Sequence, residues 1–538
     1  MSRKLLAKKS VAQIQDEAKS HALKRSLGKW NLVSLGIGCI IGAGIFVMTG
    51  TAAAQHAGPA IILSFIFTGI ACAFVGLCYA ELASVLPISG SAYTYAYATL
   101  GEVFAWVMGW LLILEYGVAA STVAVGWSGY LNSFLLGFHV MIPPQFTTAV
   151  GQPVLVTDIF RDQFLALGYH FSADGTGTLL SAAGDIVRGA FNLPAFLGIV
   201  AVSALLIIGV SESAKVNNVI VFIKVTVVVL FILIGGFYVN PANWHPLIPA
   251  KEAAGVYGWG GIFRAASIIF FAYVGFEAVS TAAQEARNPQ KDMPFGILGS
   301  LLICTVLYMG VAAVLTGIVP FKLLNVADPM AVAVDHVGLP WFSLLIKIGA
   351  IMGLSSVMLV LLYGQTRIFY IMGSDGLLPK LFCKIHPKFR TPYLNTMLVG
   401  LIVAFAAGVT PISLLGDLVS LGTLVAFMIV CFSVLYLRRT QPQLPRPFRT
   451  PFMPVTPVLG ILTCGYLVYS IFFGTDADGH IVVTESGHAV LHYTGPYCLI
   501  GAVLYIVYGS RKSHLTHGEP IAATDPKFMK KPHEPRTD

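Results

Sequence analysis

Long apolar stretches separated by short polar segments fill most of the 538-residue chain. A helix needs roughly 20 residues to cross about 30 Å of hydrocarbon, and runs of that length recur along the sequence. The pattern predicts an all-α integral membrane protein with polar tails at residues 1–29 and 510–538. About twelve membrane-spanning helices are expected, at residues 30–53, 58–80, 103–136, 192–212, 215–239, 259–283, 294–320, 341–372, 392–409, 412–437, 455–474 and 490–509.

The composition agrees with a lipid environment. The chain is 56% hydrophobic and 11% charged, and its mean hydropathy is +0.78, whereas soluble domains carry about 25% charged residues. A charge near the centre of a spanning helix costs about 2.5–3.5 kcal/mol. The net charge of +8 comes from basic residues at the ends and between apolar runs. We therefore expect membrane lipid, and no nucleic acid, as a partner.

Lysine and arginine residues indicate which ends of the spans face the cytoplasm. Residues 1–30 contain eight of them, and further clusters follow the predicted spans 341–372, 412–437 and 490–509. Loops on the opposite side contain few, and residues 475–489 contain none. Basic loops stay on the cytoplasmic side. We therefore expect a multi-pass protein of the plasma (inner) membrane with both termini in the cytoplasm.

Two connections differ from the rest. Residues 81–102 contain no Lys or Arg and are rich in small and aromatic residues, so we expect a short amphipathic helix that lies against the protein. The longest external loop, at about 137–191, is rich in Pro, Gly and Asp. The sequence indicates no function for it.

The first predicted span contains the glycine-rich segment GIGCIIGAGIF at residues 36–46. Glycines in spanning helices often serve close packing, but Gly42 and Gly44 flank a single small residue and lower helix propensity at mid-depth. Non-helical backbone survives there only where it lines a cavity or is buried in protein. We predict that Gly42 and Gly44 are non-helical, and that the N–H groups exposed there bind a carboxylate.

The sixth predicted span has a similar interruption. Gly275 lies at mid-depth and is followed by the acidic Glu277. Five spans separate the two interruptions, so the two spans run in opposite directions. Such a pair is typical of an inverted repeat with a central binding site. The repeats would be residues 30–239 and 259–437, with residues 455–509 peripheral.

Two charged residues lie where lipid would disfavour them. Lys224 is about nine residues into its span, or roughly 13 Å deep at 1.5 Å per residue, and Glu115 lies in the middle of the third span. Lys224 could instead extend its ammonium to the interface, and Glu115 could make a structural hydrogen bond between helices. Intramembrane ionisable residues usually mark ion paths or proton relays. Both residues are therefore candidates for proton coupling.

Sequence motifs for other chemistry are absent. The thirteen His residues form no HExxH motif, and no GxxxxGK[ST] motif occurs, so neither a metal site nor ATP is expected. No nucleophile–base set is visible. We expect no cofactor, protons as the coupling ion, and no enzymatic activity.

Three longer motifs are IIGAGIFVMTG, FFAYVGFEAVSTAAQEARNPQKDMP and GQTRIFYIMGSDGLLP. Together they resemble the amino acid–polyamine–organocation superfamily, and most closely its cationic amino acid transporter branch of the bacterial twelve-span type. The resemblance covers about residues 28–510. It implies the LeuT-type fold, in which helices 1 and 6 of two inverted five-helix repeats are broken and two further helices are peripheral.

The resemblance also implies roles for particular residues. The backbone at the first break would hold the substrate carboxylate, carbonyl groups at the second break would hold its α-ammonium, and Phe271 would cover the substrate. The implied substrate-binding residues are Ile41, Gly42, Ala43, Gly44, Ile45, Phe270, Phe271, Ala272 and Val274. Lys224 matches a lysine that replaces sodium in proton-coupled relatives, Glu115 matches an acidic residue near the central path, and Ser355 and Ser356 fall near the ion position.

Several functions remain open on this evidence. The leading hypothesis is a secondary active transporter that takes up L-amino acids with protons by alternating access. An exchanger without proton coupling and a non-transporting amino-acid sensor are alternatives. The expected pocket lining is apolar, which favours neutral substrates first and cationic ones second. The residues of this lining are Ile40, Ile41, Phe271, Val274 and Leu354.

Overall fold

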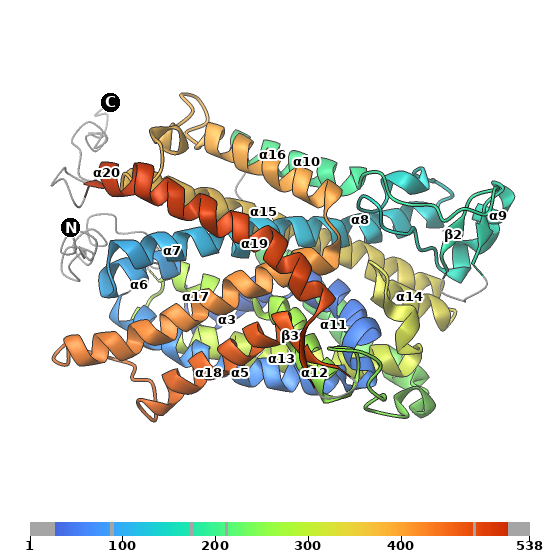
Figure 1. Cartoon of the computed structure of the whole chain (residues 1–538), viewed down its shortest axis with the longest axis horizontal. Coiled ribbons are helices and arrows are strands. Elements are labelled where there is room, and N and C mark those ends of the chain that lie inside the picture. Colours follow the sequence, from blue (N-terminus) through green and yellow to red (C-terminus); the bar gives the residue numbers. More distant parts are fainter. Residues whose placement is uncertain are drawn as a thin grey trace, which may run out of the picture.

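The computed structural model describes residues 27–86, 91–172, 177–209, 214–283, 285–476 and 480–514. Most of the predicted tails, at 1–29 and 510–538, therefore lie outside the described residues. Helices dominate and run roughly along the long axis of the molecule (Figure 1). The α-helices are α3 (Lys29–Ile40), α4 (Thr49–Ala52), α5 (Ile61–Val85), α6 (Ser91–Thr99), α7 (Glu102–Ile113), α8 (Ala119–Gly137), α9 (Arg161–Ala166), α10 (Leu193–Ile208), α11 (Ala214–Gly235), α12 (Gly258–Ile269), α13 (Pro289–Ile318), α14 (Pro329–His336), α15 (Pro340–Ser374), α16 (Tyr393–Val409), α17 (Ile412–Thr440), α18 (Val455–Phe472), α19 (Glu485–Leu504) and α20 (Ser510–Lys512).

Short 3-10 and π segments interrupt or connect these helices. They are η1 (Gly44–Met48), η2 (Ala53–Ala57), η3 (Gly58–Ala60), η4 (Leu114–Val118), η5 (Pro144–Phe146), η6 (Asp158–Phe160), η7 (Gly236–Tyr238), η8 (Pro241–Trp244), η9 (Phe270–Tyr273), η10 (Glu277–Ala282), η11 (Phe321–Leu324), η12 (Lys380–Cys383) and η13 (Tyr505–Gly509). Two antiparallel strand pairs lie in connections, β1 (His170–Phe171) with β2 (Leu179–Leu180) and β3 (Phe473–Thr475) with β4 (Ile481–Val483).

Among the described residues, nine helical segments are long and apolar enough to cross a membrane. They are Gly44–Val85, Glu102–Gly137, Asn218–Tyr238, Gly258–Ser280, Pro289–Ile318, Pro340–Ser374, Ile412–Thr440, Val455–Phe472 and Glu485–Lys512. Two shorter apolar helices, α10 and α16, accompany them and pack against each other along one side (Figure 1). The predicted all-α membrane class is confirmed, whereas the count of twelve spans stays a prediction.

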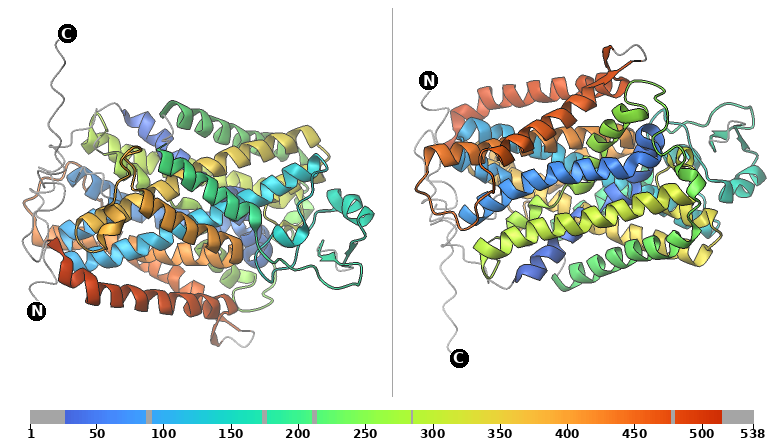
Figure 2. Two further views of the ribbon diagram at one scale, coloured as in Figure 1. Left: turned by 90° about the horizontal axis from the view of Figure 1, so that it is seen from above. Right: turned by 90° about the horizontal axis from the view of Figure 1, so that it is seen from below.

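The two ends of the molecule differ in which connections they carry. The α20 end holds α6 and α20 (Figure 1). The connection that follows α15 lies at the same end, since the N–H of His514, just after α20, donates to the carbonyl of Asp375, just after α15, at 3.1 Å. The opposite α9 end carries the loop of β1, β2 and α9, which projects beyond the helices (Figures 1 and 2). The projecting loop packs around a small separate core, formed by Leu136 of α8 and by Val154, Val156, Phe160, Phe164 and Leu179 of the loop.

Helix α6 corrects one prediction. The connection 81–102 does contain a short helix, but its tyrosines Tyr93, Tyr95 and Tyr97 are almost fully buried. The Tyr93 hydroxyl donates to Asp375 at 2.8 Å, and Tyr97 donates to Glu102 at 3.3 Å. The helix is therefore inserted into the protein rather than laid on its surface, because these hydroxyls find acceptors in the interior.

Candidate functional site

The first predicted break is present at Ile41 and Gly42. Helix α3 ends at Ile40, Ile41 is extended with φ −72° and ψ 98°, and the chain becomes helical again in the π-turn η1. The Phe46 N–H donates to the Gly42 carbonyl at 3.3 Å and opens the resumed helix. Amide groups that precede Phe46 therefore stand at a helix start, where they lack intrahelical partners and the helix dipole is positive.

Gly44 corrects the prediction for this segment, since it lies inside η1 and is helical. This position requires a glycine for a different reason. A Cβ atom at Gly44 would collide with the backbone of Ala272 in η9. Gly44 thus allows the two broken segments to touch.

The second predicted break lies at Val274 and Gly275. The chain passes from α12 into η9, then becomes extended at Val274, with φ −55° and ψ 130°, and turns at Gly275, whose φ is +116°. A Cβ atom on Gly275 would lie 2.8 Å from the Cys39 carbonyl oxygen. Both the left-handed conformation and the lack of space require glycine here.

Tyr308 of α13 joins the two breaks. Its buried hydroxyl lies 2.8 Å from the Ile40 carbonyl and 2.8 Å from the Ala272 carbonyl, and it can donate its one proton to either. These carbonyls belong to the ends of the two interrupted helices. Sequence reasoning missed Tyr308, because nothing in its span distinguishes it from a tyrosine that only packs.

The structure brings the sequence-predicted substrate residues together at these breaks. All of them are buried, and the contact of Gly44 with Ala272 joins the two groups. Phe270 packs its ring against Phe427 of α17, with centroids 5.6 Å apart. Phe271 is 5% exposed. The residues are Ile41, Gly42, Ala43, Gly44 and Ile45 on the first segment, and Phe270, Phe271, Ala272 and Val274 on the second.

Lys224 of α11 lies at the first break and not at the membrane surface. Its side chain is 1% exposed, and its Nζ donates to the Gly38 carbonyl at 2.7 Å and to the Ile41 carbonyl at 3.1 Å. A cation is favoured at the carbonyl end of a helix, so Lys224 caps α3. Its stem passes close to Gly353 of α15, where an added Cβ atom would lie 2.6 Å from the lysine Cδ.

The two predicted ion-site serines follow Gly353 on α15. The Ser355 hydroxyl donates to the Ile351 carbonyl of its own helix at 2.8 Å, and Ser356 is buried. Gly353, just before these serines, lies against the stem of Lys224, and the sequence did not single it out. A glycine there makes room for the lysine stem.

Glu115 lies near the second break, because it neighbours Glu277, the acid that follows Gly275. It sits in the π-turn η4 and is fully buried, and within the described residues neither of its carboxyl oxygens has a hydrogen-bond partner. The equally buried Glu277 is close enough for the two charges to influence each other. Glu277 accepts a hydrogen bond from the Gly275 N–H at 2.9 Å, and the Tyr116 hydroxyl lies 3.5 Å from its other oxygen. Lys224 and Glu115 therefore contact different breaks. The sequence drew attention to Glu277 only as a neighbour of Gly275.

A polar cavity of about 220 Å³ opens at the α9 end, above the resumed first helix. Gln55 and Asn325, which line it, are hydrogen-bonded at 3.0 Å. Asp328 also lines it, and burial raises the pKa of its carboxyl from about 3.8 to about 6, although Lys347 acts in the opposite direction. Lys347 itself pairs with Asp335 at 3.2 Å. The cavity thus carries one acid that titrates near neutral pH.

Comparison with known proteins identifies the family. The family described as "Amino acid permease" matches residues 27–501. The chain is 44% identical to the methylthioribose transporter of Bacillus subtilis (strain 168), over 87% of this chain and 93% of the relative. It is 42% identical to the branched-chain amino acid permease BcaP of the same organism, over 96% of this chain and 100% of the relative. It is 36% identical to the vacuolar cationic amino acid transporter 4 of Arabidopsis thaliana, over 78% of this chain and 64% of the relative.

The family match covers nearly the whole described chain, including both breaks, and every one of these relatives is named as a transporter or permease. The predicted resemblance and the predicted lack of enzymatic activity are therefore confirmed. The chain belongs to the amino acid permease family of the amino acid–polyamine–organocation superfamily and is a multi-pass membrane transporter related to the cationic amino acid transporters.

Proposed function

We propose that this protein takes up L-amino acids with protons, by alternating access, and uses no ATP or other cofactor. The observation that carries the proposal is the contact between the two breaks. One break offers the amide groups of a helix start, at Gly42–Ile45, and the other offers the carbonyl end of η9, at Phe270–Val274. A zwitterion matches this pair, because its carboxylate suits the positive helix start and its ammonium suits the carbonyl end.

The arrangement of spans supports the LeuT-type architecture. The segment Gly44–Val85 divides at Gly58, whose φ is +59°. With that division the nine segments become ten, and the shorter helices α10 and α16 would complete the twelve predicted crossings. Residues 30–239 and 259–437 would form the inverted repeats, and 455–509 the peripheral pair. The basic connections at the α20 end favour a cytoplasmic location for both termini in a plasma membrane.

Neutral substrates fit the site better than cationic ones. The predicted substrate-binding residues carry only apolar side chains or none, among them Ile41, Phe271 and Val274, and all three are buried. The relative BcaP is named as a branched-chain amino acid permease. A cationic side chain would need an acidic partner, and the buried Glu115, whose carboxyl oxygens have no hydrogen-bond partner within the described residues, is the one candidate that keeps cationic substrates in second place. We therefore propose branched-chain and similar neutral amino acids as substrates, with cationic ones second.

Lys224 supports proton coupling through its two carbonyl partners at the end of α3. A hydrogen bond from a charged donor contributes about 1.5–3 kcal/mol, and the helix dipole adds to the preference for a cation. Loss of the proton would weaken the attachment of α3 to α11 and favour movement of the broken helix. The coupling cannot exceed the free-energy difference that the proton makes between the two states. Glu115 could carry the proton instead, with Lys224 as a fixed strut.

Uptake of labelled leucine into proteoliposomes tests this proposal. With an alkaline interior and an empty lumen, we expect accumulation above the equilibrium level, and competition by valine and isoleucine more than by arginine. Protein-free vesicles and collapse of the pH gradient are the controls. Uptake only into vesicles preloaded with amino acid would identify an exchanger, and binding without any flux would identify a sensor. Both outcomes would contradict proton-coupled uptake.

A further inference from the structure

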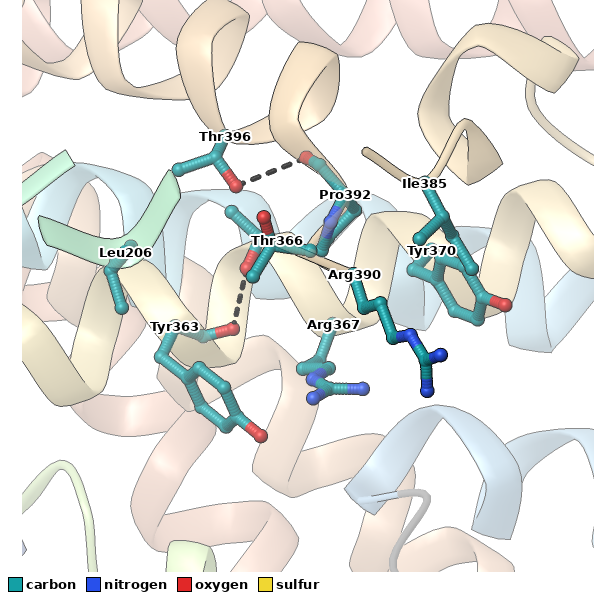
Figure 3. Close-up of a pocket in the computed structure, with 10 residues that line it drawn as sticks. Leu206, Tyr363, Thr366, Arg367, Tyr370, Ile385, Arg390, Pro392 and Thr396 are labelled. Atoms are coloured by element: carbon teal, nitrogen blue, oxygen red, sulfur yellow. Dashed lines mark hydrogen bonds between the residues drawn. The ribbon is translucent and has the colours of Figure 1, made fainter. Parts of the chain in front are cut away.

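A second polar cavity lies at the α20 end, away from the two breaks. It has a volume of about 140 Å³ and is bounded by the end of α10, the last turns of α15 and the start of α16. Its lining combines two arginines, two tyrosines and several threonines (Figure 3). The residues are Leu206, Tyr363, Thr366, Arg367, Tyr370, Ile385, Arg390, Thr391, Pro392 and Thr396. Neither the proposed transport cycle nor the family match assigns a role to this cavity.

Arg367 and Arg390 reach the cavity from different elements, and their guanidinium groups point in a similar direction (Figure 3). The Arg367 guanidinium stacks over the Tyr363 ring, 4.9 Å from its centroid. Arg390 has a φ of +56°, an unusual conformation for a side-chain-bearing residue, and its N–H donates to the His386 carbonyl at 2.9 Å. Within the described residues, neither arginine forms an ion pair.

The threonines of the cavity are already satisfied by the protein. The Thr366 hydroxyl donates to the Tyr363 carbonyl at 2.8 Å, and Thr396 donates to the Pro392 carbonyl at 3.1 Å (Figure 3). Thr391 donates to Ile207 at 2.6 Å, which ties the connection before α16 to α10. The two guanidinium groups thus remain as charged donors for a ligand, beside the hydroxyls of Tyr363 and Tyr370, and guanidinium forks match phosphate oxygens.

The surroundings of the arginines are apolar and exposed. Leu205 and Ile208 of α10, Tyr363 of α15 and Ile385 of the connection all have exposed side chains. In a membrane protein such side chains face acyl chains. Basic groups above an apolar surface at the end of a spanning helix match the shape of a phospholipid.

We propose that this cavity binds the phosphate of an anionic glycerophospholipid, with Arg367 and Arg390 on its oxygens and the acyl chains against α10 and α15. The location fits the cytoplasmic leaflet, where anionic lipid attracts basic residues. Free phosphate shares the headgroup chemistry but would gain nothing from the apolar surface.

Binding to the purified full-length protein in neutral detergent tests this site. Thermal shift would be measured with short-chain phosphatidylglycerol, short-chain phosphatidylcholine or inorganic phosphate. We expect only phosphatidylglycerol to raise Tm, and the double variant R367Q/R390Q to bind it roughly tenfold or more weakly. The control R439Q/R511Q removes two exposed arginines at the same end and should bind as the wild type does.

Four results would overturn the proposal. An equal shift with phosphatidylcholine would mean that the acyl chains alone act, and an equal shift with inorganic phosphate would mean that the ligand is a free anion. Equal losses in both double variants would indicate general charge attraction. Undiminished affinity in R367Q/R390Q would exclude these arginines. If the double variant does not fold, R390Q alone, from the exposed connection, serves for the same comparison.

Discussion

Replacing Gly275 by alanine would test whether the two breaks must touch. The alanine would hold a φ of +116°, and its Cβ atom would lie 2.8 Å from the Cys39 carbonyl oxygen. A strained backbone costs about 1–3 kcal/mol, and overpacking of a filled interior typically costs about 1–3 kcal/mol more. The obstacle is backbone, so it cannot be relieved by a rotamer change.

The strain would be released by separating the second break from α3, which moves the carbonyl end away from the amide groups that face it. If only about 2 kcal/mol is lost from binding, the apparent Kd rises about 30-fold. The assay is equilibrium binding of labelled leucine to purified protein. Gly465→Ala is the matched control, because its added Cβ atom meets nothing within 4 Å. Unchanged affinity in Gly275→Ala would refute the claim that the close approach forms the site.

Three further results are expected. Tyr308→Phe removes the one hydrogen bond that the hydroxyl shares between the Ile40 and Ala272 carbonyls, so it should cost about 1–3 kcal/mol and lower Tm in a thermal unfolding assay, and an unchanged Tm would contradict the bridge. Phe271→Ala should raise KM for uptake, because an aromatic cover excludes water from the ionic contacts, whereas an effect confined to Phe270→Ala would move the cover to Phe270. Because the pKa of Asp328 is raised to about 6, its contribution to stability is complete below about pH 4 and is lost as pH rises through 6, by up to about 3 kcal/mol. Asp328→Asn should therefore flatten the profile of Tm against pH between 4 and 7, and an identical profile would exclude this acid.

The predictable part of the fold came from backbone chemistry that is visible in single residues. Gly42 and Gly275 marked the two breaks because glycine weakens a helix wherever it falls. Lys224 and Glu115 were conspicuous because a charge in an apolar run needs a partner. These signals are local, so one sequence suffices to find them.

The remaining features depend on contacts between distant segments. Gly44 lies within a helix and serves the close approach to Ala272, about 230 positions away. The spacing of the glycines in the sequence does not distinguish such packing from a helix break. Tyr308 has ordinary sequence surroundings, and only the folded chain places it beside Ile40. Glu277 is visible as a charge in an apolar run, but its nearness to Glu115 is not. Helix α6 is buried for the same reason, because Tyr93 finds its acceptor in Asp375, far along the chain.

The measurement that tests the central claim most directly compares two kinds of flux in Lys224→Ala proteoliposomes. Exchange of labelled leucine against internal leucine needs the site and alternating access, whereas accumulation driven by a pH gradient also needs the proton. We predict that Lys224→Ala keeps exchange and loses accumulation, and that Glu115→Gln keeps at least part of both. Accumulation by Lys224→Ala with the pH dependence of the wild type would contradict the account.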